Sequence, residues 1–71
     1  MTTSEKELLP HQQRVVEETK ELGSKVKNLA AFIRDNEVFK NLPSNEQRLL
    51  IRQLSAMSLY LYVLLRRIDL F

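Results

Sequence analysis

The chain has 71 residues, of which 44% are hydrophobic and 28% charged, and it holds one Gly, two Pro and no Cys. These fractions are ordinary for one small globular domain and argue against disorder, while so few turn residues argue against a β-sandwich or barrel. Without cysteine, a disulfide framework and a thiolate zinc site are excluded. Eleven Lys and Arg against nine Asp and Glu leave a net charge of +2, which is too small to predict binding to a DNA or RNA polymer. No basic segment followed by an apolar one opens the chain, so no signal peptide is predicted and an intracellular protein is expected.

A heptad repeat predicts a first helix over residues 10–35. Its members are spaced alternately four and three residues apart and share one stripe of a helix: Val15, Thr19, Leu22, Val26, Leu29 and Ile33. Pro10 suits the first helical turn, because a missing N–H is harmless there. Gly23 lies in the helix interior, and its presence predicts close approach of a neighbouring helix at that position.

The segments on either side of this helix are short. Residues 1–9 are predicted to form an N-terminal turn, in which Ser4 and Glu7 have the spacing of a capping box. Residues 36–44 are predicted to form a linker. Three of its apolar side chains are expected to fold over the end of the molecule as a plug: Val38, Phe39 and Leu42.

A second heptad repeat predicts another helix over residues 45–69. It has the same alternating spacing and consists of Leu50, Leu54, Met57, Leu61, Leu64 and Ile68. Ser44 and Gln47 are spaced as a second capping box at its start. Two helices of similar length joined by a short linker can lie antiparallel along their whole length. The predicted fold class is therefore all-α, with residues 10–71 forming an antiparallel helical hairpin.

The second helix is apolar on more faces than the first helix can cover. From Leu59 to Leu65 it is apolar all the way round, whereas one partner helix covers a stripe of only about 100°. A chain this short, without disulfides or a metal, is also marginally stable alone. We therefore expect a homo-oligomer with closed symmetry. A membrane partner is not expected, because no cationic face exists between Arg52 and Arg66.

The residues do not indicate an enzyme. His11 has no Ser or Cys at a spacing that indicates a catalytic pair, and the sequence contains no nucleotide-binding or zinc-protease motif. No catalytic residue, cofactor or metal is therefore predicted. Acidic residues gather on the first helix, at Glu17, Glu18 and Glu21. They are interpreted as a solvated face with partners one turn away, such as Glu21 with Lys25.

Two polar stripes on the second helix are the candidate site. Arg48, Arg52 and Ser55 are about one turn apart on one side, and Tyr62 continues their line. Gln53, Tyr60 and Arg67 are spaced seven residues apart on the other flank. Arginine offers paired donors to phosphate and tyrosine offers a ring on which a base stacks. In the alternative interpretation, the arginines pair with Glu46, Asp69 or a neighbouring chain, and the tyrosines belong to the core.

The order of several short motifs resembles a known family over about residues 8–68. The first helix opens with HQQRVVEE at residues 11–18, followed by Glu21-Leu22, and carries LAAFI at residues 29–33. The linker has Phe39 and Leu42 before the second helix. That helix continues the pattern with Gln53, Met57, Tyr60, Val63-Leu64 and Arg67-Ile68. This order resembles the helical-hairpin family of phage anti-defence proteins, the sponges that counter CBASS and Thoeris immunity.

The resemblance implies a cytoplasmic protein of the infected bacterial cell that is commonly a hexamer. Such a protein binds a cyclic di- or trinucleotide, or a cyclic ADP-ribose isomer, between protomers and withholds it from host effectors without cleaving it. The predicted ligand-binding residues follow from side-chain chemistry and are not carried over from the family: Arg48 and Arg52 for phosphates, Tyr60 with Arg67 for a base, and Arg14 with Lys20 for a more peripheral pocket. The segment before Pro10 has no aromatic residue to cover a ligand, which argues against a lidded pocket.

A second class of function stays open at this point. The apolar face of the second helix could instead dock another protein, which would make the hairpin an interaction module.

Overall fold

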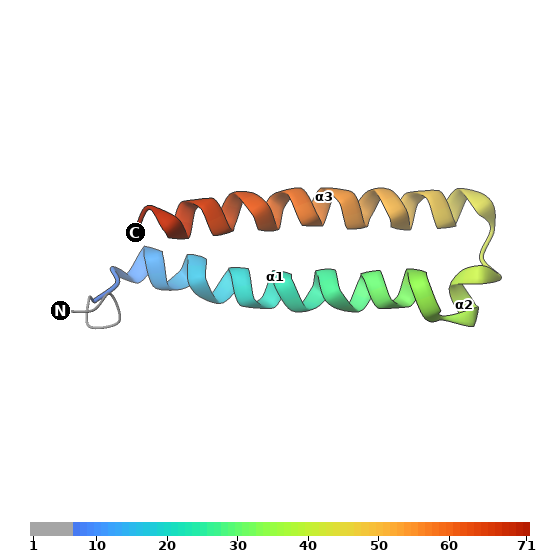
Figure 1. Cartoon of the computed structure of the whole chain (residues 1–71), viewed down its shortest axis with the longest axis horizontal. Coiled ribbons are helices and arrows are strands. Elements are labelled where there is room, and N and C mark those ends of the chain that lie inside the picture. Colours follow the sequence, from blue (N-terminus) through green and yellow to red (C-terminus); the bar gives the residue numbers. More distant parts are fainter. Residues whose placement is uncertain (1–6) are drawn as a thin grey trace.

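The computed structural model describes residues 7–71 and contains helices α1 (Pro10–Asp35), α2 (Glu37–Lys40) and α3 (Ser44–Asp69). α1 and α3 run antiparallel and side by side, and α2 lies at the turn between them (Figure 1). The radius of gyration is 16.0 Å, against about 11 Å for a compact domain of this length. The prediction of an all-helical chain whose two long helices pack together is confirmed, and residues 7–71 contain no strand.

Local polar contacts determine where α1 begins. Pro10 occupies the first helical turn, as its missing N–H predicts. The Gln12 side chain reaches back and its Oε1 accepts a hydrogen bond of 2.9 Å from the backbone N–H of Leu9. This contact satisfies one donor that the helix itself leaves free. Ser4, and with it the capping box predicted with Glu7, lies outside the described residues.

The core between α1 and α3 is small. Its buried members are Val15, Leu22 and Leu64, and Leu64 is 0% exposed. Partly buried side chains of both heptads and of the C-terminus pack against them: Val26, Met57, Leu61, Ile68 and Phe71. Thr19 is also buried, and its hydroxyl donates a 2.7 Å hydrogen bond to the backbone oxygen of Val15. A polar residue therefore fits this stripe because its donor is satisfied within its own helix.

Gly23 does not mark a close approach of α3, and the prediction made for it is wrong. A Cβ built at this position has nothing within 4 Å. Glycine here gains nothing from packing against α3, while it retains the low helix propensity of a residue with a flexible backbone.

Replacing Gly23 with alanine is therefore expected to stabilise the hairpin by about 0.5–1 kcal/mol, the difference in helix propensity between the two residues. Urea unfolding followed by circular dichroism measures the change. Destabilisation would contradict the expectation and indicate that something outside the single chain contacts α1 at this position. Ser24→Ala, at the exposed neighbouring position, controls for general effects of added helix propensity.

The linker contains one helical turn, α2, which is too short to show a helical periodicity in the sequence. Asn36 Oδ1 accepts a 2.8 Å hydrogen bond from the N–H of Val38 and so caps α2. Phe39 is buried and its ring meets Phe32 edge-on, with centroids 6.0 Å apart. The predicted plug is correct for Phe39 and partly for Leu42, which is half-buried. It is wrong for Val38, whose side chain is 59% exposed.

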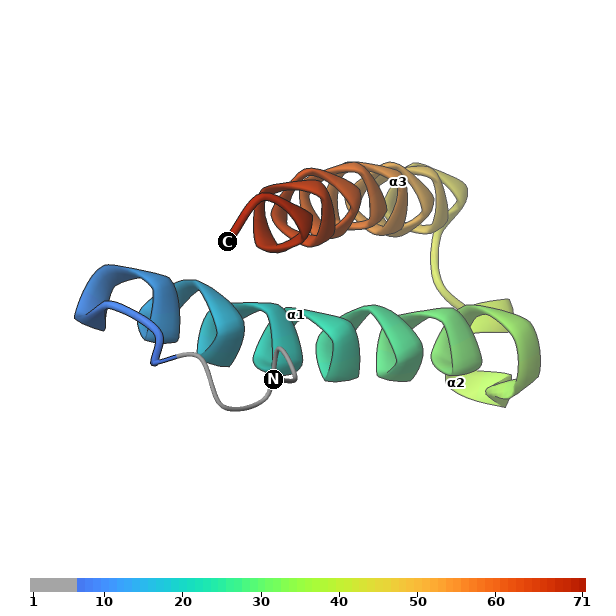
Figure 2. The same cartoon turned by 60° about the vertical axis from the view of Figure 1, so that its left-hand side comes forward.

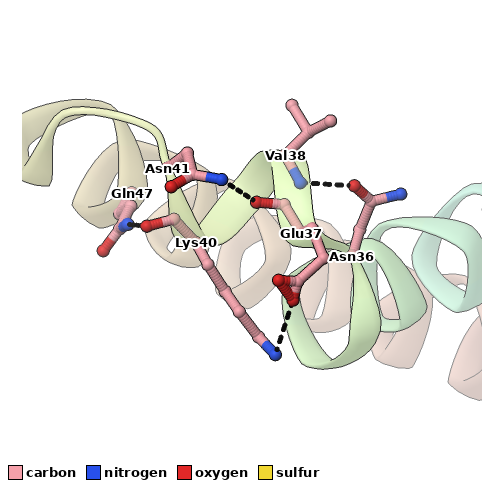
Figure 3. A network of polar contacts seen from close by, with 6 residues as sticks. All are labelled: Asn36, Glu37, Val38, Lys40, Asn41 and Gln47. Carbon is pink, nitrogen blue, oxygen red and sulfur yellow. Dashed lines mark hydrogen bonds and ion pairs between the residues drawn. The ribbon is translucent and has the colours of Figure 1, made fainter.

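Gln47 joins the linker to α3 instead of closing a capping box. α3 begins at Ser44, one residue before the predicted start, and its cap residue, Pro43, makes no side-chain hydrogen bond. The Gln47 amide Nε2 instead lies within 2.9–3.2 Å of three linker carbonyl oxygens, those of Phe39, Lys40 and Leu42. Figure 3 shows the contact with Lys40 beside the Asn36, Glu37 and Asn41 bonds of α2. The carbonyl oxygens at the end of α2 have no partner within that helix, so they accept hydrogen bonds from the Gln47 amide, which then does not cap α3.

One side of α3 is uncovered. The two views in Figures 1 and 2 place α1 against a single side of α3, and none of the other described elements lies on the far side. Seven large apolar residues of this helix are exposed: Leu49, Ile51, Leu59, Tyr60, Tyr62, Val63 and Leu65. The excess of apolar surface expected on this helix is thus present in the hairpin.

α3 also meets the length and composition of a membrane-spanning helix. Its mean hydropathy over 18 residues reaches 1.2, and 6% of that window is buried. The core helix of a soluble protein passes the same test, so length and composition alone do not identify the environment of this face. The expectation that the partner is not a membrane stays a prediction.

Candidate functional site

Arg48 and Arg52 lie one turn apart on the uncovered side of α3. Both side chains are exposed, and neither forms an ion pair within residues 7–71. The pairing with Glu46 or Asp69 considered as an alternative is therefore absent from the single hairpin. Ser55 is exposed one turn further on, so the structure keeps the predicted stripe together. Guanidinium groups without a carboxylate partner are available to an anion.

Tyr60 and Arg67 lie on the flank of α3 that faces the edge of α1. Tyr60 is 46% exposed, and its hydroxyl donates a hydrogen bond to Glu18 Oε2 of α1. This bond is the main reason why the pKa of Tyr60 lies above its usual value, with burial and the Glu18 charge adding to the shift. The Arg67 charge opposes the shift, so Arg67 acts on the same phenol. The two predicted residues thus lie on the same flank of α3, about two turns apart.

The surface around Tyr60 is not uniformly basic. A recess of about 120 Å³ beside its ring is lined by Glu18, Glu21, Leu22 and Lys25. Glu21 and Lys25 share this recess without forming the predicted ion pair, since the described residues contain only two ion pairs, Arg34 with Asp35 and Lys40 with Glu37. Two carboxylates repel phosphate. An anion beside Tyr60 would therefore find its favourable charge at Arg67 and not in this recess.

The Glu18 contact predicts an alkaline dependence of stability. A phenol whose pKa is raised in the folded chain stabilises the fold at pH values below about 10, and this contribution is lost as the pH rises through the raised value. In a Tyr62→Phe background Tyr60 is the sole tyrosine. There, Glu18→Gln is expected to lower the Tyr60 pKa, measured as the absorbance of the phenolate during titration. An unchanged titration curve would contradict the contact, and Glu17→Gln is the matched control.

Arg14 and Lys20 do not share a face of α1. They are six residues apart, which places their side chains about 120° apart around a helix. Both are exposed. A single hairpin does not assemble the peripheral pocket predicted for them, so that pocket stays a prediction that needs a second chain.

Two further features lie outside the predicted site residues. A recess of about 290 Å³ at the end of α1 is lined by Asn28, Ala31, Phe32, Asp35 and Asn36. The spacing of Asn28, Phe32 and Asp35 by four and three residues was the available signal in the sequence. On α3, the guanidinium of Arg66 lies 6.0 Å from the centre of the Tyr62 ring, one turn away. Arg66 thus adds an exposed cation to the uncovered side of the helix.

Acidic and histidine side chains do not gather into a metal-binding cluster within residues 7–71, where groups of three or more are absent. His11 is exposed in the first turn of α1.

These features define a class of protein: an antiparallel helical hairpin with an uncovered helix face that carries arginine and tyrosine. The model of one family, Sequestin, matches residues 9–70 and so covers both long helices and the linker. The chain belongs to the Sequestin family. Comparison with curated proteins and with solved structures gives no match.

Proposed function

We propose that this chain is a phage anti-defence protein that sequesters a cyclic oligonucleotide or a cyclic ADP-ribose isomer in the cytoplasm of the infected bacterium. The ligand stays bound and unchanged, and the protein performs no chemistry on it. Membership of the Sequestin family supports sequestration. The observation that carries the proposal is the pair Arg48 and Arg52, exposed and without an ion-pair partner within residues 7–71, beside uncovered apolar surface.

The chemistry of the ligand matches these side chains. A phosphodiester keeps its negative charge at every physiological pH, so a pocket for it needs donors that also keep their charge. Arg48 and Arg52 supply such donors one turn apart on a rigid helix. Tyr60 provides the ring on which a base stacks, with Arg67 beside it.

Assembly into a homo-oligomer, proposed as a hexamer from the family resemblance, completes this function. Only four apolar side chains are buried among the described residues, whereas ten large ones are exposed. Burial of that surface between protomers would supply the stability that a short hairpin lacks. It would also enclose the arginine stripe, which strengthens contacts between guanidinium groups and phosphate by excluding water.

Docking of another protein on the same apolar face is the alternative. The observation that favours it is the size of the exposed surface on α3, which any apolar partner could cover. This interaction module predicts no stabilisation by small nucleotides.

A thermal-shift panel distinguishes the two functions. The probes are cyclic dinucleotides, cyclic trinucleotides and cyclic ADP-ribose isomers, with the linear form of each as its control. A probe at about 100 times its dissociation constant should stabilise the protein by about 2.7 kcal/mol. Chromatography after denaturation should recover the bound probe intact. Absence of a shift with every probe would favour the interaction module, and a linearised product would identify an enzyme.

A further inference from the structure

A further heptad repeat, distinct from the two predicted for the core, runs along the uncovered side of α3, opposite the stripe that packs on α1. Its members are spaced alternately three and four residues apart: Leu49, Arg52, Ala56, Leu59, Val63, Arg66 and Leu70. All seven are exposed, Leu59 by 65% and Leu70 by 86%. We call this set the outer seam. Scattered exposed leucines need no explanation, but an exposed heptad repeat is the pattern by which one helix packs on another.

The outer seam reads almost the same in both directions. From either end the order is Leu, Arg, a small or β-branched residue, and Leu59 at the middle. A second copy of the helix placed antiparallel therefore meets leucine near leucine at the ends and apolar side chains at the centre. This self-complementarity is what a two-fold symmetric contact requires. In a parallel pair each residue would meet its own copy, so a pattern that reads the same in both directions would give no advantage.

We propose that two copies of this chain pair through their outer seams, with the α3 helices antiparallel and crossing near Leu59. The proposal rests on the proposed function and extends it, because the pairing builds the anion site from two chains. At each end of the pair, Arg48 and Arg52 of one chain lie near the partner subunit's Arg66 and the partner subunit's Arg67. Four guanidinium groups thereby lie close together at each end of the pair.

Such a cluster needs an anion. Four neighbouring positive charges repel each other, so the pair is weakened at its two ends while the apolar centre holds it together. A ligand that carries two phosphates relieves the repulsion. The Tyr62 ring, already stacked against Arg66 at 6.0 Å, adds an aromatic surface beside the phosphates. Binding of the cyclic nucleotide and pairing of the chains are therefore linked, and each strengthens the other.

Single cysteines test the orientation, because the chain has none of its own. Leu49→Cys and Leu70→Cys are at opposite ends of the outer seam, roughly 30 Å apart within one helix. In an antiparallel pair each faces the other across the contact. A short bismaleimide should therefore crosslink the mixture of the two variants into a covalent dimer, and it should leave each variant alone uncrosslinked. Crosslinking of each variant by itself would overturn the antiparallel pairing, and absence of crosslinking throughout would overturn the outer seam as the contact.

Addition of pyrophosphate or of a cyclic dinucleotide tests the shared anion site. Either probe should raise the yield of the crosslinked mixture, whereas chloride at equal ionic strength should not. Leu59→Glu should abolish both the crosslinked mixture and the stabilisation by the cyclic nucleotide, while circular dichroism still shows a folded hairpin. Ser58→Glu adds the same charge at an exposed polar position of α3 outside the seam and is the matched control.

The outcomes separate this inference from the proposed function. If Leu59→Glu prevents pairing but binds the cyclic nucleotide as the parent does, the site belongs to one chain and the shared pocket is wrong. If the parent crosslinks as expected but no cyclic nucleotide stabilises it, the pairing stands and the proposed function fails. Flotation of the protein with phospholipid vesicles, together with absence of crosslinking, would identify a lipid surface as the occupant of the seam.

Discussion

Leu64→Ala is expected to lower the free energy of unfolding by about 2–5 kcal/mol, the range found when a fully buried leucine is truncated. Leu64 is 0% exposed and lies in the buried cluster with Val15 and Leu22. Domains of this length have a total stability of roughly 4–11 kcal/mol, so the variant loses a large part of it. The cost is expected to be near the upper end, because a core with so few buried side chains has little else to fill the cavity.

Urea unfolding at fixed protein concentration measures this loss, since an oligomer makes stability depend on concentration. Leu65→Ala is the matched control. Leu65 is the next residue of α3 but is 48% exposed, so its truncation is expected to cost well under half as much in the single hairpin. A small cost for Leu64→Ala would contradict the described core. Equal and large costs for the two variants would instead indicate that a partner chain covers Leu65 as fully as α1 covers Leu64.

Arg48→Ala and Arg52→Ala are expected to weaken binding of the cyclic nucleotide by roughly 10- to 150-fold per site, the loss of one charge-assisted contact to phosphate. Calorimetry measures the change in dissociation constant. Because one substitution removes every symmetry-related copy, the loss grows with the number of copies that contact one ligand. Both variants must first retain the oligomeric mass of the parent in light scattering.

Arg34→Ala is the matched control for these variants. Arg34 is also exposed on a helix, but its guanidinium is engaged by Asp35 at 2.8–3.1 Å and lies on α1 near the linker. It is expected to leave the affinity unchanged. If Arg48→Ala and Arg52→Ala bind as tightly as the parent, the pocket lies elsewhere, and Tyr60 with Arg67 is the next pair to replace.

Helix positions and the side of each helix that is buried were predictable from the sequence. Residues 10–35 match the range of α1, and α3 begins one residue before the predicted position. Both follow from local physics, because the period of 3.6 residues places i, i+3 and i+4 on one side whatever the rest of the chain does. The same periodicity keeps Arg48 and Arg52 together, because they are four residues apart, and it separates Arg14 from Lys20, because these are six apart.

Contacts between helices were not predictable in this way. Tyr60 and Glu18 are 42 positions apart, and Gln47 meets the carbonyls of the linker rather than capping its own helix. Gly23 was expected to mark a contact between helices, but a Cβ at this position would meet open space. Each outcome depends on the rotation of α1 and α3 about their own axes and on their offset along them. Periodicity within one helix leaves these quantities free, and packing of Leu64 against α1 and closure of the linker around Phe39 determine them.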